Sequence, residues 1–182
     1  MKQQSFLPKI KLEHGGSLTI RKRINTRPLA VKKPLHLVLK SELGKGKRSL
    51  LRNKALVLRI QAKYAKRFQV RIYKNAVCGT HIHCLVKGHS RRGLQNFFRV
   101  FAGQVAQEIL KLYPLQRNEA RAFIGGVHHK NQKSFWSFLA YTRVVNWGRD
   151  FIGAKLYVKR NVLEALGFIP YERPAKRKRH PE

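Results

Sequence analysis

The segment from residue 68 to residue 112 constrains the fold more than any other part of this chain. Two stretches of alternating apolar and polar residues, 68–73 and 80–86, are separated by a short turn that contains Gly79. Apolar residues then recur at helical spacing from Leu94 to Leu112. A period of two predicts strands, and a period of 3.6 predicts an amphipathic helix. The segment therefore predicts a β-hairpin followed by a long helix that packs on the core.

The other patterns place this segment in an α+β domain. The predicted elements are, in order, a strand at 35–40, a helix at 51–65, the hairpin, the long helix, β-like segments near 123–124, 135–136 and 141–145, and a last helix at 150–165. Asp150 is the expected N-cap of the last helix, and Gly167 is its expected C-terminal signal. This order of elements predicts a ferredoxin-like antiparallel sheet with helices on one face.

The charge of the chain points to a polyanionic partner. Forty Lys and Arg face eight Asp and Glu, which gives a formal net charge of +32. Nucleic acid is the first partner that such a charge predicts, and a membrane surface is the second. We expect residues 1–33 to form a basic N-terminal arm, 34–170 the domain, and 171–182 a basic C-terminal tail.

The two cysteines, Cys78 and Cys84, are too few for a disulfide framework, which favours an intracellular protein. No apolar run approaches the roughly 20 residues of a membrane span. The N-terminus also lacks the apolar core of a signal peptide. These features predict a cytoplasmic protein.

Residues 80–86, with the sequence THIHCLV, carry two imidazoles on one predicted strand. Successive strand side chains point to opposite faces, so His81 and His83 should project together and Cys84 away from them. Imidazoles at positions i and i+2 can both reach one divalent ion, and neutral histidine nitrogens suit Mn, Zn and related metals. Magnesium can be held there together with phosphate oxygens and water. The same pair also fits an exposed polar strand face.

Two other interpretations of a metal site involve nearby residues. Cys78 and Cys84 could join the histidine pair in a structural zinc site, because zinc takes nitrogen and sulfur ligands. The alternation of a regular strand opposes this reading, since it points Cys84 away from both histidines. His128 and His129 could add a ligand or form a surface pair in a loop.

A second candidate group lies in the last predicted helix. Tyr157 and Asn161 are four residues apart and therefore share one helical face. A tyrosine hydroxyl can be a covalent nucleophile at phosphorus, although its reference pKa of about 10 means that it needs help at neutral pH. The Asn161 amide oxygen can bind a metal or orient a phosphate. Tyr141 is the runner-up nucleophile, but its i+4 residue, Val145, offers no polar partner.

These segments together resemble the single-tyrosine HUH transposases, and in particular their REP-associated branch. Residues 80–86 resemble the HUH motif (His, hydrophobic, His), and residues 157–167 resemble the tyrosine helix, in which Asn follows Tyr by four residues. The resemblance covers about 34–170. Thr80 stands where family members more often carry Asn, and Val162 follows Asn161 where Pro is usual.

The resemblance implies the HUH endonuclease fold and a transposase-like endonuclease and strand transferase that cuts single-stranded DNA near hairpins. Tyr157 would attack the scissile phosphate, form a 5′-phosphotyrosine intermediate and release a 3′-OH. His81 and His83 would hold a divalent ion, Mg or Mn, with Asn161 as a third ligand or orienting group. The protein would be bacterial and nucleoid-associated. Both a monomer and a homodimer that exchanges the tyrosine helix stay open.

Binding of DNA should be mostly electrostatic, through basic residues near the site. The predicted DNA-binding residues are Arg91, Arg92, Arg143, Arg149, Lys155, Lys159 and Arg160. Trp136 and Trp147 could stack unpaired bases or could pack in the core. The alternatives to a nuclease are an HUH-fold nucleic-acid-binding protein that has lost catalysis and an unrelated basic RNA-binding protein.

Overall fold

The computed structural model describes residues 12–19, 26–115 and 134–171. Five strands form one antiparallel sheet in the order β1-β5-β2-β4-β3. The strands are β1 (Glu13–His14), β2 (Leu35–Lys40), β3 (Val70–Val77), β4 (His81–Gly88) and β5 (Tyr141–Val144). The helices of the described part are α1 (Lys54–Arg67), α2 (Arg91–Leu112) and α4 (Arg149–Ala165), with short 3-10 turns at Gly16–Thr19 and Gly46–Arg48.

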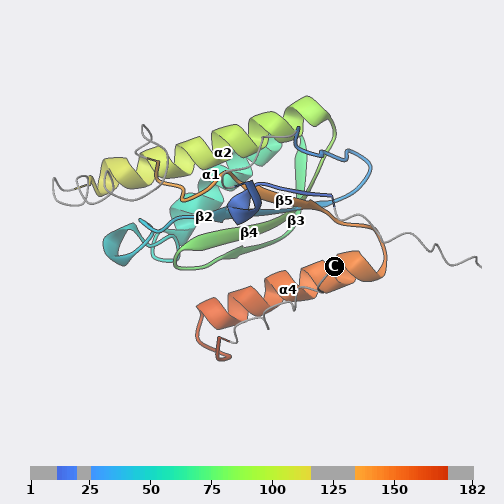
Figure 1. Cartoon of the computed structure of the whole chain (residues 1–182). Coiled ribbons are helices and arrows are strands. Elements are labelled where there is room, and N and C mark those ends of the chain that lie inside the picture. The colour runs from blue at the N-terminus through green and yellow to red at the C-terminus, as the bar shows by residue number, and fades with distance from the viewer. Residues whose placement is uncertain (1–11, 20–25, 116–133, 172–182) are drawn as a thin grey trace, which may run out of the picture.

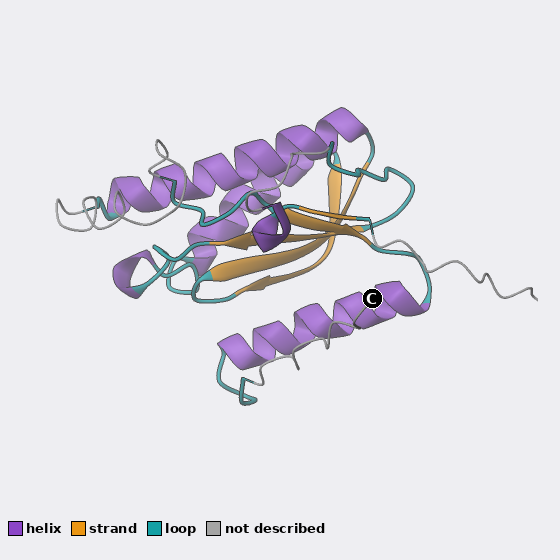
Figure 2. Cartoon of the chain, viewed as in Figure 1, coloured by secondary structure: helices purple, strands orange, loops and turns teal. Residues whose placement is uncertain are grey.

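The sheet lies between two helical layers, with α1 and α2 on one face and α4 on the other (Figures 1 and 2). Strand alternation explains the main core, because it turns the leucines of β2 and the alternate residues of β4 toward α1 and α2. The apolar stripe of α2 packs on them. The largest side chains of this core are fully buried and include Leu35, Leu37, Ile82, Leu94, Phe97 and Phe101.

The α+β class, the antiparallel sheet and the hairpin are confirmed. The expectation that helices cover one face holds for α1 and α2 and fails for α4, which contacts β3 and β4 from the opposite side. Local periodicity showed that this helix is amphipathic, but a choice between two sheet faces depends on which face still exposes apolar area.

Three local predictions differ from the structure. Residues 135–136 form bends rather than a strand. Asp150 is not the N-cap of α4, because Gly148 occupies that position and Asp150 lies in the first turn, where its carboxylate accepts a hydrogen bond from the Asn146 amide. The segment expected to be an arm contributes β1, which pairs with β5. By contrast Gly167 has φ +78° after the end of α4, as its role as a C-terminal signal requires.

Several predicted features lie outside the described residues: the segment at 123–124, the pair His128 and His129, and most of both expected tails. None of the described helices combines the length and the apolar character that crossing a lipid bilayer requires.

Candidate active site

Strand register gathers polar side chains on the sheet face that α4 covers. Residues directly opposite each other on antiparallel strands share a face. Val38 of β2 lies opposite His83 of β4 on one side and Tyr141 of β5 on the other. His36, two residues earlier on β2, lies opposite Arg143. The face opposite the main core therefore carries side chains from three adjacent strands.

His36 and His83 are diagonal neighbours on this face. The distance between His36 Nε2 and His83 Nδ1 is 3.1 Å, and the two ring planes are within 15° of each other. Both side chains are buried, with exposed fractions of 7% and 5%. One of the two nitrogens must donate and the other accept, so this contact couples the tautomers of the two rings.

His81 and Asn161 connect β4 to the tyrosine helix. The His81 ring lies 4.9 Å from that of His83, and its Nδ1 is 3.3 Å from the hydroxyl of Thr80. Asn161 is buried and donates from Nδ2 to the main-chain oxygen of Tyr157 over 2.8 Å. The Asn161 side chain faces His81 closely enough to raise the pKa of that imidazole, although burial lowers the pKa by more.

Tyr157 lies at the open side of this histidine cluster. Its ring centroid is 5.5 Å from that of His83 and 5.8 Å from that of His36, and its side chain is 46% exposed. The apolar stripe of α4 orients it, since Ala154 and Val158 pack on the sheet and Tyr157 lies at the edge of that stripe. Within one chain, α4 therefore brings a phenolic group to the histidines of β2 and β4.

The cluster borders a groove of about 1080 Å³. Its lining includes His36, His83 and Tyr157, together with side chains of β1, β2, β5 and the start of α4. Two of its lining residues are acidic, Glu13 and Asp150. A ligand in the groove can therefore reach Tyr157 together with His36 and His83, whereas His81 and Asn161 are not among the lining residues.

Tyr141, the runner-up nucleophile, also lines the groove. Burial and, to a smaller extent, the negative charge of Glu13 raise its pKa to about 12. A hydroxyl group with a raised pKa is harder to ionise. The raised pKa therefore counts against Tyr141 as the nucleophile.

The histidines are suited to a divalent ion because burial keeps them neutral. Desolvation lowers the pKa of His36 to about 4 and that of His83 to about 2, and it also lowers the pKa of His81. A neutral imidazole offers a lone pair to a metal at neutral pH. The described residues contain no group of three His, Cys, Asp or Glu side chains that could hold a metal. The donor set predicted from the sequence, His81 and His83 with the Asn161 amide oxygen, therefore stays a prediction.

The buried histidines predict an acid-sensitive fold. The positive charge of Arg143 also lowers the pKa of His36, and those of His36 and His81 lower the pKa of His83. The unfolded chain therefore binds more protons than the folded one below about pH 6.5, and stability is lost as the pH falls. We expect the free energy of unfolding in metal-free buffer to be about 1–3 kcal/mol lower at pH 5 than at pH 7.

Denaturant titrations of wild type and two variants check this expectation. The double variant with His36→Asn and His83→Asn should show a shallower dependence on pH. His89→Asn is the matched control, because His89 is exposed just after β4 and should leave the dependence unchanged. If the free energy of unfolding depends equally on pH in wild type and in the double variant, His36 and His83 are not the source of the acid sensitivity.

The predicted DNA-binding residues fall into two groups. Arg143 and Arg149 line the groove, and Arg143 is paired with Asp150 at 2.9 Å. The basic residues of α4 are exposed along that helix, where Arg160 pairs with Glu164 at 2.9 Å; they are Lys155, Lys159 and Arg160. Arg91 and Arg92 begin α2, which packs on the other face of the sheet, so the fold does not bring them to the groove.

The cysteines do not form a zinc site with both histidines. Cys84 is fully buried in the main core and accepts a hydrogen bond from Gln61, as the alternation predicted. Cys78 lies under α4, where its thiol donates to the main-chain oxygen of Asn161 over 3.6 Å. Burial raises the pKa of both thiols, to about 11 for Cys78 and about 12 for Cys84, which opposes thiolate ligation.

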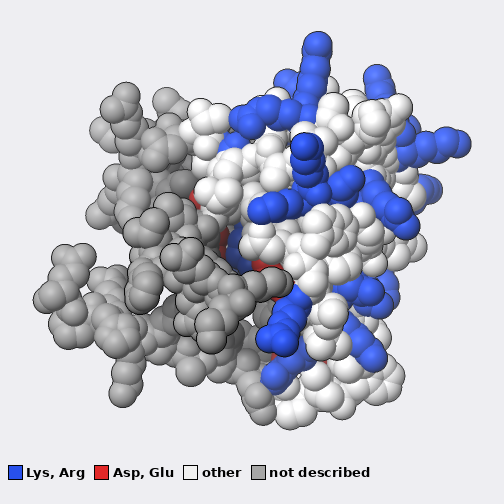
Figure 3. Space-filling view, turned by 90° about the vertical axis from the view of Figure 1, so that its right-hand side faces the viewer, with Lys and Arg blue, Asp and Glu red and all other residues white. Residues whose placement is uncertain are grey.

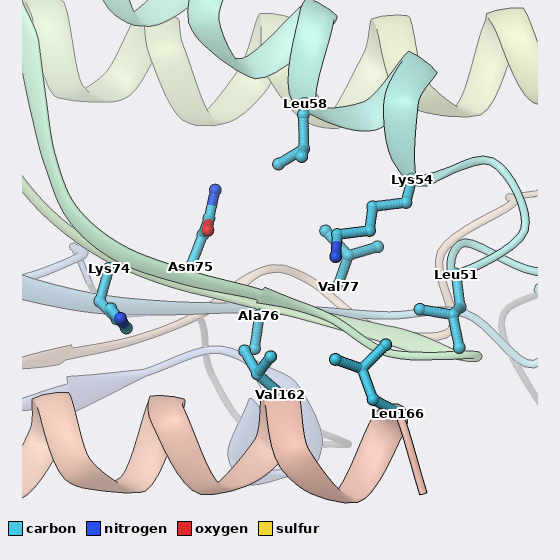
Figure 4. A pocket seen from close by; sticks show the side chains of 9 residues that line it. All are labelled: Leu51, Lys54, Leu58, Lys74, Asn75, Ala76, Val77, Val162 and Leu166. Atoms are coloured by element: carbon cyan, nitrogen blue, oxygen red, sulfur yellow. The ribbon is translucent and has the colours of Figure 1, made fainter. Parts of the chain in front are cut away.

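A second cavity of about 230 Å³ lies between α1, β3 and the end of α4 (Figure 4). Lys54 reaches toward it from α1, and Val162 and Leu166 border it from α4 (Figure 4). None of its lining residues is one of the predicted site residues. It has no part in the candidate site.

Sequence reasoning did not select His36 as a site residue. The signal was present, because His36 alternates with Leu35 and Leu37 and so must face away from the main core. The sequence pattern does not reveal the strand order, and only the pairing of β2 with β4 places His36 beside His83. Glu13 was missed because β1 was not predicted.

No protein-family model and no curated protein sequence matches this chain. Among solved structures, a REP-associated tyrosine transposase bound to a REP hairpin is similar, with a TM-score of 0.54 and 12% identity over 82% of this chain and 81% of that one. A candidate transposase from Deinococcus radiodurans gives a TM-score of 0.43 and 14% identity over 76% of this chain and 98% of that one. The first comparison confirms, at the level of the fold, the resemblance found in the sequence motifs.

Proposed function

We propose that this protein is a single-tyrosine endonuclease and strand transferase acting on single-stranded DNA that contains a hairpin. The observation that supports the proposal most is the approach of Tyr157 to His83 within one groove, with ring centroids 5.5 Å apart. A net charge of +32 supports a nucleic-acid substrate. The similar transposase was solved with a REP hairpin, which supports a hairpin as the form of that substrate.

In the proposed reaction, the phenolic oxygen of Tyr157 attacks the scissile phosphorus and loses its proton. A bond forms between that oxygen and phosphorus, and the bond from phosphorus to the 3′ oxygen breaks. The 3′ oxygen gains a proton and leaves as a 3′-OH, while the 5′ phosphate stays on Tyr157. One phosphoester replaces another, so a later 3′-OH can reverse the step without ATP.

His81, His83 and Asn161 would hold a divalent cation, Mg or Mn, next to Tyr157. When bound, such an ion supplies charge that polarises a phosphoryl oxygen. The histidines contribute neutral nitrogens. Asn161 is held on α4 by the bond from its Nδ2 to the main-chain oxygen of Tyr157. Arg149, at the rim of the groove, is suited to bind a flanking phosphate.

His36 is expected to orient His83. If His83 Nδ1–H donates to His36 Nε2, the other nitrogen of His83 stays available as a ligand. His36→Ala should weaken Mn²⁺ binding by roughly 10- to 100-fold. His36→Gln should restore part of the affinity, because its amide oxygen can accept from the same N–H. Titration of Mn²⁺ followed by electron paramagnetic resonance measures both values without DNA, and wild-type affinity in His36→Ala would rule out the orienting role.

The test of the proposed function is a covalent protein–DNA adduct. The full chain is incubated with a single-stranded hairpin oligonucleotide labelled at its 3′ end, with Mn²⁺ or Mg²⁺, and is analysed on a denaturing gel. The label must be at the 3′ end because the strand on the 3′ side of the cut stays on the protein. A slowly migrating, protease-sensitive band is expected. Hairpin binding without adduct or cleavage would favour the alternative, a DNA-binding protein that has lost catalysis.

A further inference from the structure

An aromatic cluster beside the start of α4 is not used by the proposed chemistry. Trp147 lies between β5 and α4, two residues before Arg149, and contacts Phe151 of α4 and Tyr73 of β3. The ring centroids of Trp147 are 4.9 Å from those of Phe151 and 5.9 Å from those of Tyr73. Tyr73 and Phe151 are 5.1 Å apart at an angle of 85°, so the three rings support one another.

The indole of Trp147 is both exposed and held in place. Its exposed fraction is 48%, whereas Tyr73 and Phe151 are half-buried beneath it. Its Nε1–H donates to the main-chain oxygen of Lys32 over 3.0 Å, so the polar group of the ring is satisfied. A large ring fixed by packing and a hydrogen bond offers contact area at a low cost in conformational entropy.

Two cations lie against rings of the cluster. The guanidinium of Arg71 lies 5.2 Å from the ring centroid of Tyr73, and the ammonium of Lys155 lies 5.7 Å from that of Phe151. Figure 3 views the end of the molecule at which α2 and α4 begin; Lys and Arg side chains spread over the described part of this face, and Asp and Glu show only small areas. Rings flanked by positive charges suit a ligand that joins planar groups to phosphates.

We propose that Trp147, supported by Tyr73 and Phe151, is a stacking platform for an unpaired base of a bound DNA strand. The proposal that this is the same strand that is cut rests on the proposed function. Phe151 and Tyr157 are six residues apart on α4, which is about 9 Å along the helix axis. Because the two side chains also point in different directions around the helix, the platform would hold a base several nucleotides from the phosphate at Tyr157.

Trp136 provides an internal control. It is half-buried against the main core, donates from Nε1 to the main-chain oxygen of Ala102 over 2.9 Å, and contacts Phe135 edge to face. It belongs to the core and should not respond to DNA. The two tryptophans of the chain can therefore be told apart by single substitutions.

The experiment uses the full chain with Tyr157→Phe, without metal, so that binding is measured without cleavage. Oligothymidylate should quench tryptophan fluorescence, and this quenching should persist in Trp136→Phe and vanish in Trp147→Phe. Trp147→Leu, which keeps an apolar side chain and removes the ring system, should weaken oligothymidylate binding by roughly 5- to 100-fold. It should change binding of an abasic strand of equal length less than about twofold, because that strand has the same phosphates and no bases.

Two results would overturn the platform: equal weakening for both strands, which indicates a purely electrostatic or structural role, or quenching that disappears only in Trp136→Phe. Circular dichroism of each variant verifies folding, and Trp147→Phe serves as the milder change if Trp147→Leu does not fold. The proposed stacking platform and the proposed nuclease activity can be rejected independently of each other. Quenching at Trp147 with no adduct in the wild-type chain would keep the platform and reject the nuclease, and an adduct with no effect at Trp147 would do the reverse.

Discussion

Replacing Tyr157 by phenylalanine is expected to abolish the covalent adduct and to reduce cleavage of hairpin DNA by roughly 10³-fold or more, because it removes the proposed nucleophile. The substitution deletes one oxygen from a side chain that is 46% exposed and keeps the ring that contacts His36 and His83. Folding and equilibrium DNA binding should therefore stay within about twofold of wild type. The 3′-labelled hairpin assay measures the adduct, and fluorescence anisotropy without metal measures binding.

Tyr141→Phe is the matched control, because Tyr141 lines the same groove and has a pKa raised to about 12 by burial. This variant should form the adduct. Loss of the adduct in Tyr141→Phe, with an undiminished adduct in Tyr157→Phe, would assign the nucleophile to β5 and reject the role of α4. An adduct that persists in both would place the nucleophile on another residue.

Replacing His83 by alanine is expected to remove metal-dependent cleavage, with a loss of roughly 10²- to 10⁴-fold, because it deletes one of the two proposed imidazole ligands. His81→Ala should have a similar effect, because it deletes the other proposed imidazole ligand. Both variants should show weaker Mn²⁺ binding in the same titration that tests His36.

His89→Ala is the matched control, since His89 lies one residue beyond β4 and its side chain is exposed. It should cleave and bind Mn²⁺ like wild type. Because loss of a buried ring can destabilise the sheet, unfolding of His83→Ala is followed in parallel, and His83→Asn is a second variant of smaller structural cost. Cleavage that survives chelation by EDTA would show that no metal takes part.

Much of the local structure was predictable because periodicity reports which side chains face a core. The leucines of β2, the alternation of His81 and His83, and the apolar stripe of α2 each require only neighbouring residues to be read. The end of α4 at Gly167 was predictable for the same reason, since glycine adopts a positive φ without strain. The start of α4 was not, because Asp150 forms an ion pair with Arg143 of another element instead of capping the helix.

The candidate site shows where such reasoning ends. Tyr157, Asn161, His81 and His83 could be selected from spacing and chemistry, whereas His36 and Glu13 could not, since their importance depends on which strands are neighbours. Register places His36 diagonally from His83 and puts Glu13 opposite Arg143. Tyr157 meets these residues because α4 packs on this face of the sheet. Ala154 and Val158 make the packing contacts with β3 and β4.

Charge, periodicity and residue spacing are properties of the chain itself, and they were sufficient to predict an α+β domain, a polyanionic partner and the pair of histidines with a tyrosine. Contacts between residues far apart in the chain are not encoded by any local pattern. Only the tertiary structure therefore revealed three features: the 3.1 Å contact of His36 with His83, the position of Tyr157 beside them, and the exposure of Trp147. The physical reason is that burial and neighbouring charge, which make these histidines neutral and leave that indole accessible, exist only after the strands have paired and the helices have packed.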